Sequence, residues 1–194
     1  MQRLCPVALG IKEYRAAPAA AVTPDSRRCP FCSDRHPLRI HGCYRRFALL
    51  PDPDEPHLIP VMRLLCSRTG KTVSLLPEFC TPRRQHGPAI LARFLSAWVS
   101  GAGLLPALRS VRRDVAGHSV AQSLFRGFRD RIATIKVYLA GIRPCGAGTP
   151  PTVPESRRPI ADVFFALIAD ARDAVTAFLH HGVALHNRFH LGIA

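Results

Sequence analysis

Cys29-Pro30-Phe31-Cys32 and Cys66-Ser67-Arg68-Thr69 are the two stretches of this 194-residue chain that decide its fold. Two cysteines separated by two residues form a tight knuckle whose thiolates both reach one Zn²⁺, and a second knuckle from a distant strand normally completes the tetrahedron. In the second knuckle Thr69 stands where the fourth cysteine is expected, and a hydroxyl is a poor zinc ligand. The two knuckles therefore predict a zinc ribbon in which one usual ligand is replaced.

The fourth ligand has to come from another residue. His36 follows the first knuckle closely enough to fold back onto it, whereas His41 and Cys43 would reach only if their strand bends, because each strand residue adds about 3.3 Å. An alternative is that zinc has been lost and that the cysteines remain as small buried apolar side chains. The predicted ligands of one zinc ion are Cys29, Cys32, His36 and Cys66.

Prolines and glycines divide the first half of the chain into segments. Residues 1–26, which are rich in alanine and proline, are expected to form a flexible arm, and residues 27–82 the zinc ribbon. Inside the ribbon, extended stretches at 38–50 and 58–65 flank a proline-rich loop, and 72–76 would add a third strand. The expected structure of this half is a small β unit.

The second half has the period of helices. Apolar residues recur at helical spacing across 88–98, and a shorter helix is expected over 104–115. Ser119 and Gln122 match a capping box, which predicts a further helix from 119 to 139. The expected fold class is therefore α+β. The segments after the ribbon are a helix-turn-helix-like unit (83–140), a Pro/Gly linker (141–159) and a C-terminal helix with its tail (160–194).

The order helix, short helix, glycine-containing turn and capped helix is typical of a helix-turn-helix, whose second helix enters the major groove of DNA. Gln binds adenine and Arg binds guanine through two hydrogen bonds each. The alternative is an ordinary surface helix whose arginines face solvent. The candidate contacts on the capped helix are Ser119, Gln122, Ser123, Arg126 and Arg129.

Charge points towards a polyanion. The chain has 27 basic and 13 acidic residues, and a net charge of +14 favours phosphate contacts and counterion release. A GC-rich genome would also enrich arginine, so the position of each arginine matters more than the total. Arginine pairs are common on ordinary surfaces, but three of them are candidates for phosphate contacts: Arg45 and Arg46, Arg83 and Arg84, and Arg112 and Arg113.

Several motifs together resemble a known family. They are the two knuckles, His41-Gly42-Cys43-Tyr44-Arg45-Arg46, and Ser74-Leu75-Leu76-Pro77-Glu78-Phe79-Cys80-Thr81-Pro82. With the helical region to about residue 140, they resemble zinc-ribbon plus helix-turn-helix proteins of undefined function among bacterial transposases and transposon-associated proteins. The resemblance implies binding of double-stranded DNA, with a second copy of the chain or a transposition protein as a further partner.

The sequence does not favour an enzyme. It has no phosphate-cradling glycine loop and no nucleophile elbow, and Asp162, Asp170 and Asp173 lie in a helix without the sheet core that a transposase needs. A histidine-rich end (His180, His181, His186, Asn187 and His190) superficially resembles a nuclease motif, but no hairpin precedes it. After DNA binding, the second possible function is that of an adaptor that docks a recombinase or other protein through the incomplete ribbon. The third is that of a nuclease with an unfamiliar active site.

Location and further partners follow from cysteine usage and hydropathy. Seven cysteines without a secretory signal are expected to be reduced thiols in a cytoplasm, where a DNA-binding protein would associate with the nucleoid. No stretch approaches about 20 apolar residues, so no membrane partner is expected. No small-molecule substrate is expected either.

Overall fold

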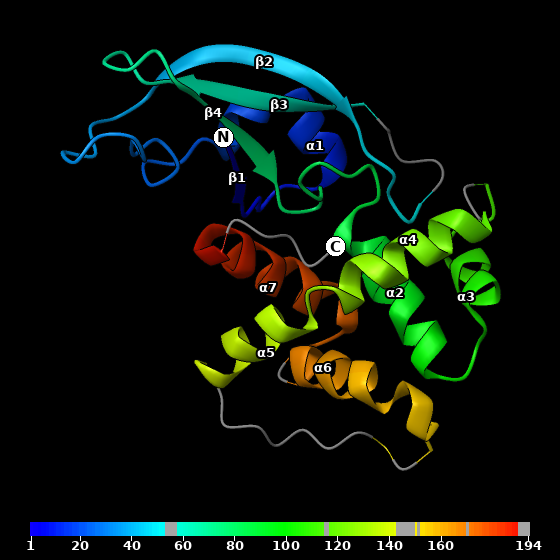
Figure 1. The fold of residues 1–194 in the computed structure, drawn as a ribbon. Helices are drawn as coiled ribbons and strands as arrows, with labels where there is room; N and C mark the ends of the chain where they lie inside the picture. Colours follow the sequence, from blue (N-terminus) through cyan, green and yellow to red (C-terminus); the bar gives the residue numbers. More distant parts are fainter. Residues whose placement is uncertain (53–57, 115–116, 143–149, 151, 170, 190–194) are drawn as a thin grey trace.

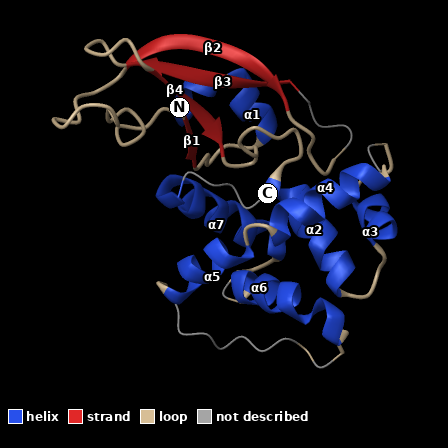
Figure 2. Cartoon of the chain, viewed as in Figure 1, coloured by secondary structure: helices blue, strands red, loops and turns tan. Residues whose placement is uncertain are grey.

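A four-stranded sheet lies over a layer of helices in this computed structural model (Figure 1, Figure 2). The structure describes residues 1–52, 58–114, 117–142, 150, 152–169 and 171–189. The helices and strands belong to the α+β class, as the sequence predicts. None of the described helices is long and apolar enough to cross a membrane.

The sheet has the strand order β1-β4-β3-β2. Strands β2 (Arg39–Phe47), β3 (Leu58–Leu65) and β4 (Thr72–Pro77) form an antiparallel meander, and β1 (Gln2–Cys5) pairs with β4 in parallel. β2 is an edge strand whose residues are exposed or half-buried. The two knuckles lie at one end of this sheet, where β2 begins and where β3 turns into β4.

The expected flexible arm over residues 1–26 is instead folded onto the sheet. It contains β1, helix α1 (Ile11–Ala16) and the 3-10 helix η1 (Pro18–Ala21). Tyr14 is buried, and its hydroxyl donates a hydrogen bond of 2.7 Å to the Pro60 carbonyl of β3. The arm was predicted from its alanines and prolines, but Leu4, Cys5 and Tyr14 supply enough apolar surface to join the core.

The helical layer contains α2 (Pro88–Val99), α3 (Leu104–Val111), α4 (His118–Arg129), α5 (Ile132–Ala140), α6 (Arg158–Ile168) and α7 (Ala174–Phe189), with the 3-10 helix η2 (Glu155–Arg157) before α6. The predicted helices at 88–98 and 104–115 correspond to α2 and to a shorter α3. Phe94, Phe128, Phe164 and Phe178 are fully buried side chains of its core. Large aromatic side chains at helical spacing thus hold this layer together.

Two predicted long helices are each divided in two. The helix expected over 119–139 breaks between α4 and α5, where the Arg131 guanidinium donates a hydrogen bond of 2.6 Å to the Gly127 carbonyl. The C-terminal helix expected from residue 160 is α6 followed by α7. Asp173 accepts hydrogen bonds from the Thr176 amide, at 3.0 Å, and from its hydroxyl, at 2.8 Å, which is how a cap starts a new helix. Asp173 therefore caps the start of α7 instead of lying inside one long helix.

The predicted linker at 141–159 is only partly described, because residues 143–149, with Cys145, and 151 lie outside the described residues. Its described end is packed. Val153 is buried, and the Arg157 guanidinium donates to the carbonyls of Trp98 and Ala102 while lying 4.8 Å from the Trp98 ring centroid. This end of the segment is therefore fixed to α2.

Helix α7 covers the free edge of β1. His186 donates from Nε2 to the Gln2 carbonyl at 3.1 Å, and Asn187 donates to the Leu4 carbonyl at 3.3 Å. These two hydrogen bonds pair the carbonyls that an edge strand would otherwise expose. The resemblance of this end to a nuclease motif therefore corresponds to a structural contact; Asp170 and His190 lie outside the described residues.

Candidate metal centre and nucleic-acid interface

The first knuckle is closed by main-chain hydrogen bonds that bring His36 back to Cys29. The Cys29 amide donates to the His36 carbonyl at 2.9 Å, and the Leu38 amide donates to the Arg27 carbonyl at 2.6 Å. Arg35 has a positive φ of 47°, which turns the chain at the tip. The loop therefore folds back as the spacing of its residues predicts.

The second knuckle is the turn between β3 and β4. The Cys66 amide donates to the Lys71 carbonyl at 2.9 Å, and the Gly70 amide donates to the Cys66 carbonyl at 2.9 Å. Gly70 has a φ of 66°, a value that glycine adopts without strain. An ion pair of 2.7 Å between Arg68 and Asp34 joins this turn to the first knuckle.

The two knuckles bring four potential ligand atoms together. The thiol sulfurs of Cys29, Cys32 and Cys66 and a ring nitrogen of His36 all lie within 4.8 Å of one another. The sulfurs of Cys32 and Cys66 are 3.7 Å apart, and the sulfur of Cys66 is 3.4 Å from His36 Nε2. Zinc bonds in tetrahedral geometry would place two sulfurs about 3.8 Å apart, and a sulfur and a nitrogen about 3.6 Å apart. The cluster can hold a metal ion, and its geometry is compatible with zinc.

His36 is oriented for this role by its other ring nitrogen. Nδ1 lies 3.2 Å from the Pro37 carbonyl, which can only accept, so Nδ1 carries the proton. Nε2 is then the unprotonated nitrogen that a metal requires, and such a second hydrogen bond is usual for metal-binding histidines. His41 and Cys43, the alternatives for the fourth ligand, are exposed on β2 and do not belong to the cluster.

Thr69 does not belong to the ligand set, yet it acts on the cluster. Hydrogen bonding from its hydroxyl, supported by the Thr69 and Arg68 amides, lowers the pKa of Cys66, although burial opposes the shift. Burial and hydrogen bonds with the neighbouring thiols raise the pKa of Cys32. Of these two thiols, Cys66 therefore ionises more readily than Cys32. This effect of Thr69 was not predicted, because its hydroxyl was assessed only as a metal ligand.

A cavity of about 1140 Å³ lies beside the first knuckle, between that loop, β1 and Asn187 of α7. Its wall includes Arg3, Arg28 and Arg35, with Asp25 paired to Arg28 at 3.2 Å. This cavity is not predictable from the sequence, because about half of its wall comes from residues 1–26, which were expected to form a flexible arm.

The predicted contact residues of the capped helix lie on α4. Ser119, Ser123, Arg126 and Arg129 are exposed and Gln122 is half-buried, while Ala121, Leu124 and Phe128 pack inwards. The helix begins at His118 with Gly117 as its N-cap and no side-chain cap, so the predicted capping box of Ser119 and Gln122 does not form. Arg126 and Arg129 lie in the last turn of α4 rather than near its start.

Within the arginine pairs, the two members differ in exposure and contacts. Arg45, Arg83 and Arg113 are exposed, whereas Arg46 donates to the carbonyls of Thr81, at 3.2 Å, and Arg84, at 2.6 Å. Arg84 is half-buried, with Nη1 3.5 Å from the Ser123 hydroxyl.

Arg112 differs from the other predicted contacts because its side chain is only 1% exposed. It donates to the Leu50 carbonyl at 2.6 Å, to Asp114 Oδ1 at 2.8 Å and to Asp114 Oδ2. Its hydrogen bond to Leu50 joins the end of α3 to the segment that follows β2. The prediction of a phosphate contact at Arg112 is therefore wrong, because these partners already occupy a buried guanidinium.

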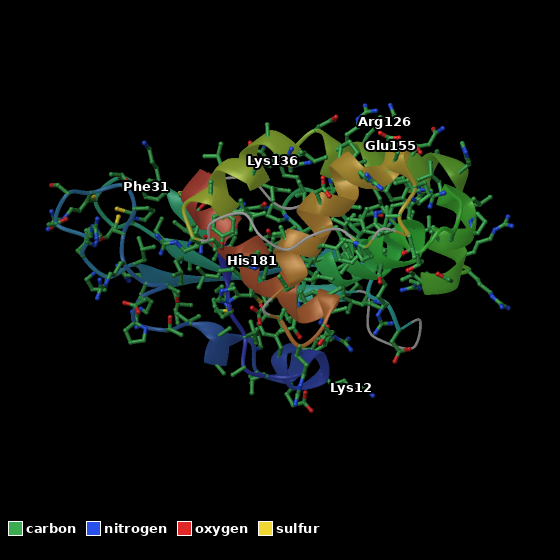
Figure 3. All side chains as sticks on the ribbon, turned by 90° about the horizontal axis from the view of Figure 1, so that it is seen from below. Lys12, Phe31, Arg126, Lys136, Glu155 and His181 are labelled. Carbon is green, nitrogen blue, oxygen red and sulfur yellow. The ribbon has the colours of Figure 1, made fainter. Side chains whose placement is uncertain are left out.

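The metal cluster and α4 lie apart. Figure 3 places Phe31, which stands between the two cysteines of the first knuckle, towards one end of the molecule and Arg126 far from it in the other half. A small ligand of α4 would therefore not touch the metal centre. Comparisons of the chain with family models, curated proteins and solved structures found no match.

Proposed function

We propose that this chain binds double-stranded DNA through α4 and that a zinc ion in the Cys₃His cluster stabilises the sheet. Four protein ligands would close the tetrahedron, which is typical of structural zinc, whereas catalytic zinc keeps a position for water or substrate. The cluster therefore supports a structural role for the ion. The motifs that resemble those of transposon-associated proteins support double-stranded DNA as the ligand.

The observation that carries the proposal is the cationic outer face of α4. Arg126 and Arg129 project from the side opposite to Leu124 and Phe128, which fix the helix in the core. The helix follows α3, which packs against both α2 and α4, in the order of a helix-turn-helix. Arginines on a helix fixed by a core can contact phosphates and bases without reorganising the protein.

Fluorescence anisotropy with a pooled random duplex, across a salt series, tests the DNA-binding proposal. We expect Arg126→Ala/Arg129→Ala to weaken binding and to reduce the salt slope by about 2, because each phosphate contact contributes about one counterion. The matched control is Lys12→Ala/Arg15→Ala, which removes the same charge from the exposed side of α1 (Lys12 and Arg126 are labelled in Figure 3). Equal weakening in both variants would show that only total charge matters.

Zinc binding is tested separately. We expect purified protein to contain about one zinc ion per chain, and Co²⁺ in its place to give the absorption of a tetrahedral thiolate site. His36→Ala should change that spectrum, whereas His41→Ala should not, because His41 lies outside the cluster. A cobalt spectrum unchanged by His36→Ala would contradict the ligand set.

The edge strand β2 favours a second function, that of a protein-interaction adaptor. Its outer main-chain groups lie at the edge of the sheet, and apolar side chains stand near both ends: Ile40 is 53% exposed, Phe47 43% and Leu58 of neighbouring β3 47%. A partner peptide could add a strand there. Absence of DNA binding at low salt, together with capture of a recombinase that Phe47→Asp abolishes, would favour this function.

A further inference from the structure

Two arginines that are far apart in the sequence contact the same residue of α4. The Arg131 guanidinium donates a hydrogen bond of 2.6 Å to the Gly127 carbonyl. The Arg84 guanidinium covers the α-carbon of Gly127, where an added methyl carbon would lie 2.9 Å from Nη2 and 3.1 Å from Cζ. The absence of a side chain at Gly127 is therefore what allows Arg84 to lie on the helix.

The charges of these two arginines are not balanced by an ion pair. Among the described residues, neither Arg84 nor Arg131 forms one with a carboxylate; Asp130 next to them lies 3.7 Å from Arg129. Nε of Arg131 is buried without a hydrogen-bond partner. Burial, and then the charge of Arg84, lower the pKa of Arg131, and the charge of Asp130 offsets only part of this shift. The two cations therefore repel each other. An anion between them would relieve this repulsion.

Neighbouring groups hold the pair in place. Arg46 donates to the main-chain carbonyls of Thr81 and Arg84, which fixes the segment from which the Arg84 side chain extends. Ser123, one turn before Gly127, offers an exposed hydroxyl 3.5 Å from Arg84 Nη1. Two guanidinium groups and a hydroxyl thus gather on one side of α4.

We propose that Arg84, Arg131 and the Ser123 hydroxyl form a binding site for a phosphate group. Guanidinium groups match the geometry of phosphate oxygens, and a hydroxyl donates to the same anion. Within the proposed function, on which this part rests, the occupant is a backbone phosphate of DNA lying along α4. The site would then fix the position of the DNA backbone while Arg126 and Arg129 make the neighbouring contacts.

Gly127→Ala is the most selective test. The three atoms nearest to the added methyl group all belong to the flexible end of Arg84, so the methyl group displaces the guanidinium while alanine improves the helix propensity of α4. We expect inorganic phosphate to bind about tenfold more weakly, because one charge-assisted contact is lost. NMR of the arginine Nε–H groups measures this binding. A short duplex, measured by fluorescence anisotropy, should lose affinity by about the same factor. Arg84→Ala should have the same effect.

Two controls separate this effect from unfolding and from net charge. Gly103→Ala adds the same methyl group at the start of α3, where its closest contact is an ordinary 3.5 Å to Pro106, and Arg15→Ala removes one exposed charge from α1. Both should leave phosphate binding unchanged, and Gly127→Ala should keep a Tm at or above that of the wild type.

The outcomes distinguish this site from the proposed function. If Gly127→Ala and Arg84→Ala weaken both ligands, the phosphate site and its DNA occupant stand. If the wild type binds phosphate and Gly127→Ala weakens this binding, but the wild type binds no duplex, the phosphate site is supported with a free phosphoester as its ligand. The DNA-binding function is then contradicted. If the wild type binds duplex and Gly127→Ala binds phosphate and duplex equally well, this inference is overturned while the DNA function stands.

Discussion

The metal cluster and the outer face of α4 are built in opposite ways. In the cluster, main-chain hydrogen bonds within two short loops place the side chains, and all four ligand atoms converge. On α4, Leu124 and Phe128 pack into the core, and Arg126 and Arg129 are exposed on the opposite side. Short-range spacing therefore determines most of a convergent site, whereas a surface depends on how distant elements pack.

Metal removal should break the cluster and leave the helical layer folded. We expect Cys66→Ser to lose zinc and to expose residues 27–38 and 66–72 to hydrogen exchange, because structural zinc contributes on the order of 10 kcal/mol to the folding of small zinc domains. Amides of α2 and α6, whose core does not include the cysteines, should stay protected.

Cys43→Ser is the control for this measurement, because Cys43 is exposed on β2 and lies outside the cluster. Loss of protection throughout α2 and α6 in the Cys66→Ser protein would show that the two layers unfold together. That result would contradict the prediction that the helical layer stays folded without the metal ion.

Arg112→Ala tests the connection between the two layers. We expect it to lower the free energy of unfolding by about 2 kcal/mol, because the buried Leu50 carbonyl loses its charged donor. Arg113→Ala, at the next position but exposed, should change it by less than about 0.5 kcal/mol. Urea denaturation measures the free energy of unfolding of both variants. An equal free energy for Arg112→Ala and Arg113→Ala would contradict a structural role for Arg112.

The same contrast explains what the sequence could predict. His36 is predictable because only three residues separate it from Cys32, which is close enough for the loop to fold back onto the knuckle. Helix α2 was found because its apolar residues repeat at helical spacing. These predictions depend on neighbours in the sequence, which the printed chain shows directly.

Tertiary contacts explain what the sequence could not predict. Arg112 and Arg113 are adjacent residues of the same type, so the sequence does not show which of them is buried. Only the hydrogen bond from Arg112 to the Leu50 carbonyl distinguishes the two. β1 was missed because its partner, β4, lies about seventy residues later. The break at Arg131 depends on a side chain that returns to the Gly127 carbonyl, which no helical period reveals.

His86 gives the smallest expected effect. Burial lowers the pKa of His86, and the charges of Arg84 and Arg112 lower it further. The folded protein therefore resists protonation of His86 more than the unfolded chain does, whose histidines titrate near pH 6.5. The stability that neutral His86 provides is present above pH 6.5 and is lost as the pH falls towards its folded pKa.

His86→Gln should flatten this part of the pH dependence when urea midpoints are compared between pH 7.5 and 5 with zinc present throughout. His118→Gln, at the exposed start of α4, is the control and should keep the wild-type slope. A metal ion bound at the cluster would also be released as its ligands take up protons, so only the difference between the two variants reports His86. An identical slope for both would mean that neither burial nor the positive charges of Arg84 and Arg112 lower the pKa of His86 in the folded protein. Phosphate bound at Arg84 should reduce the difference between the two variants.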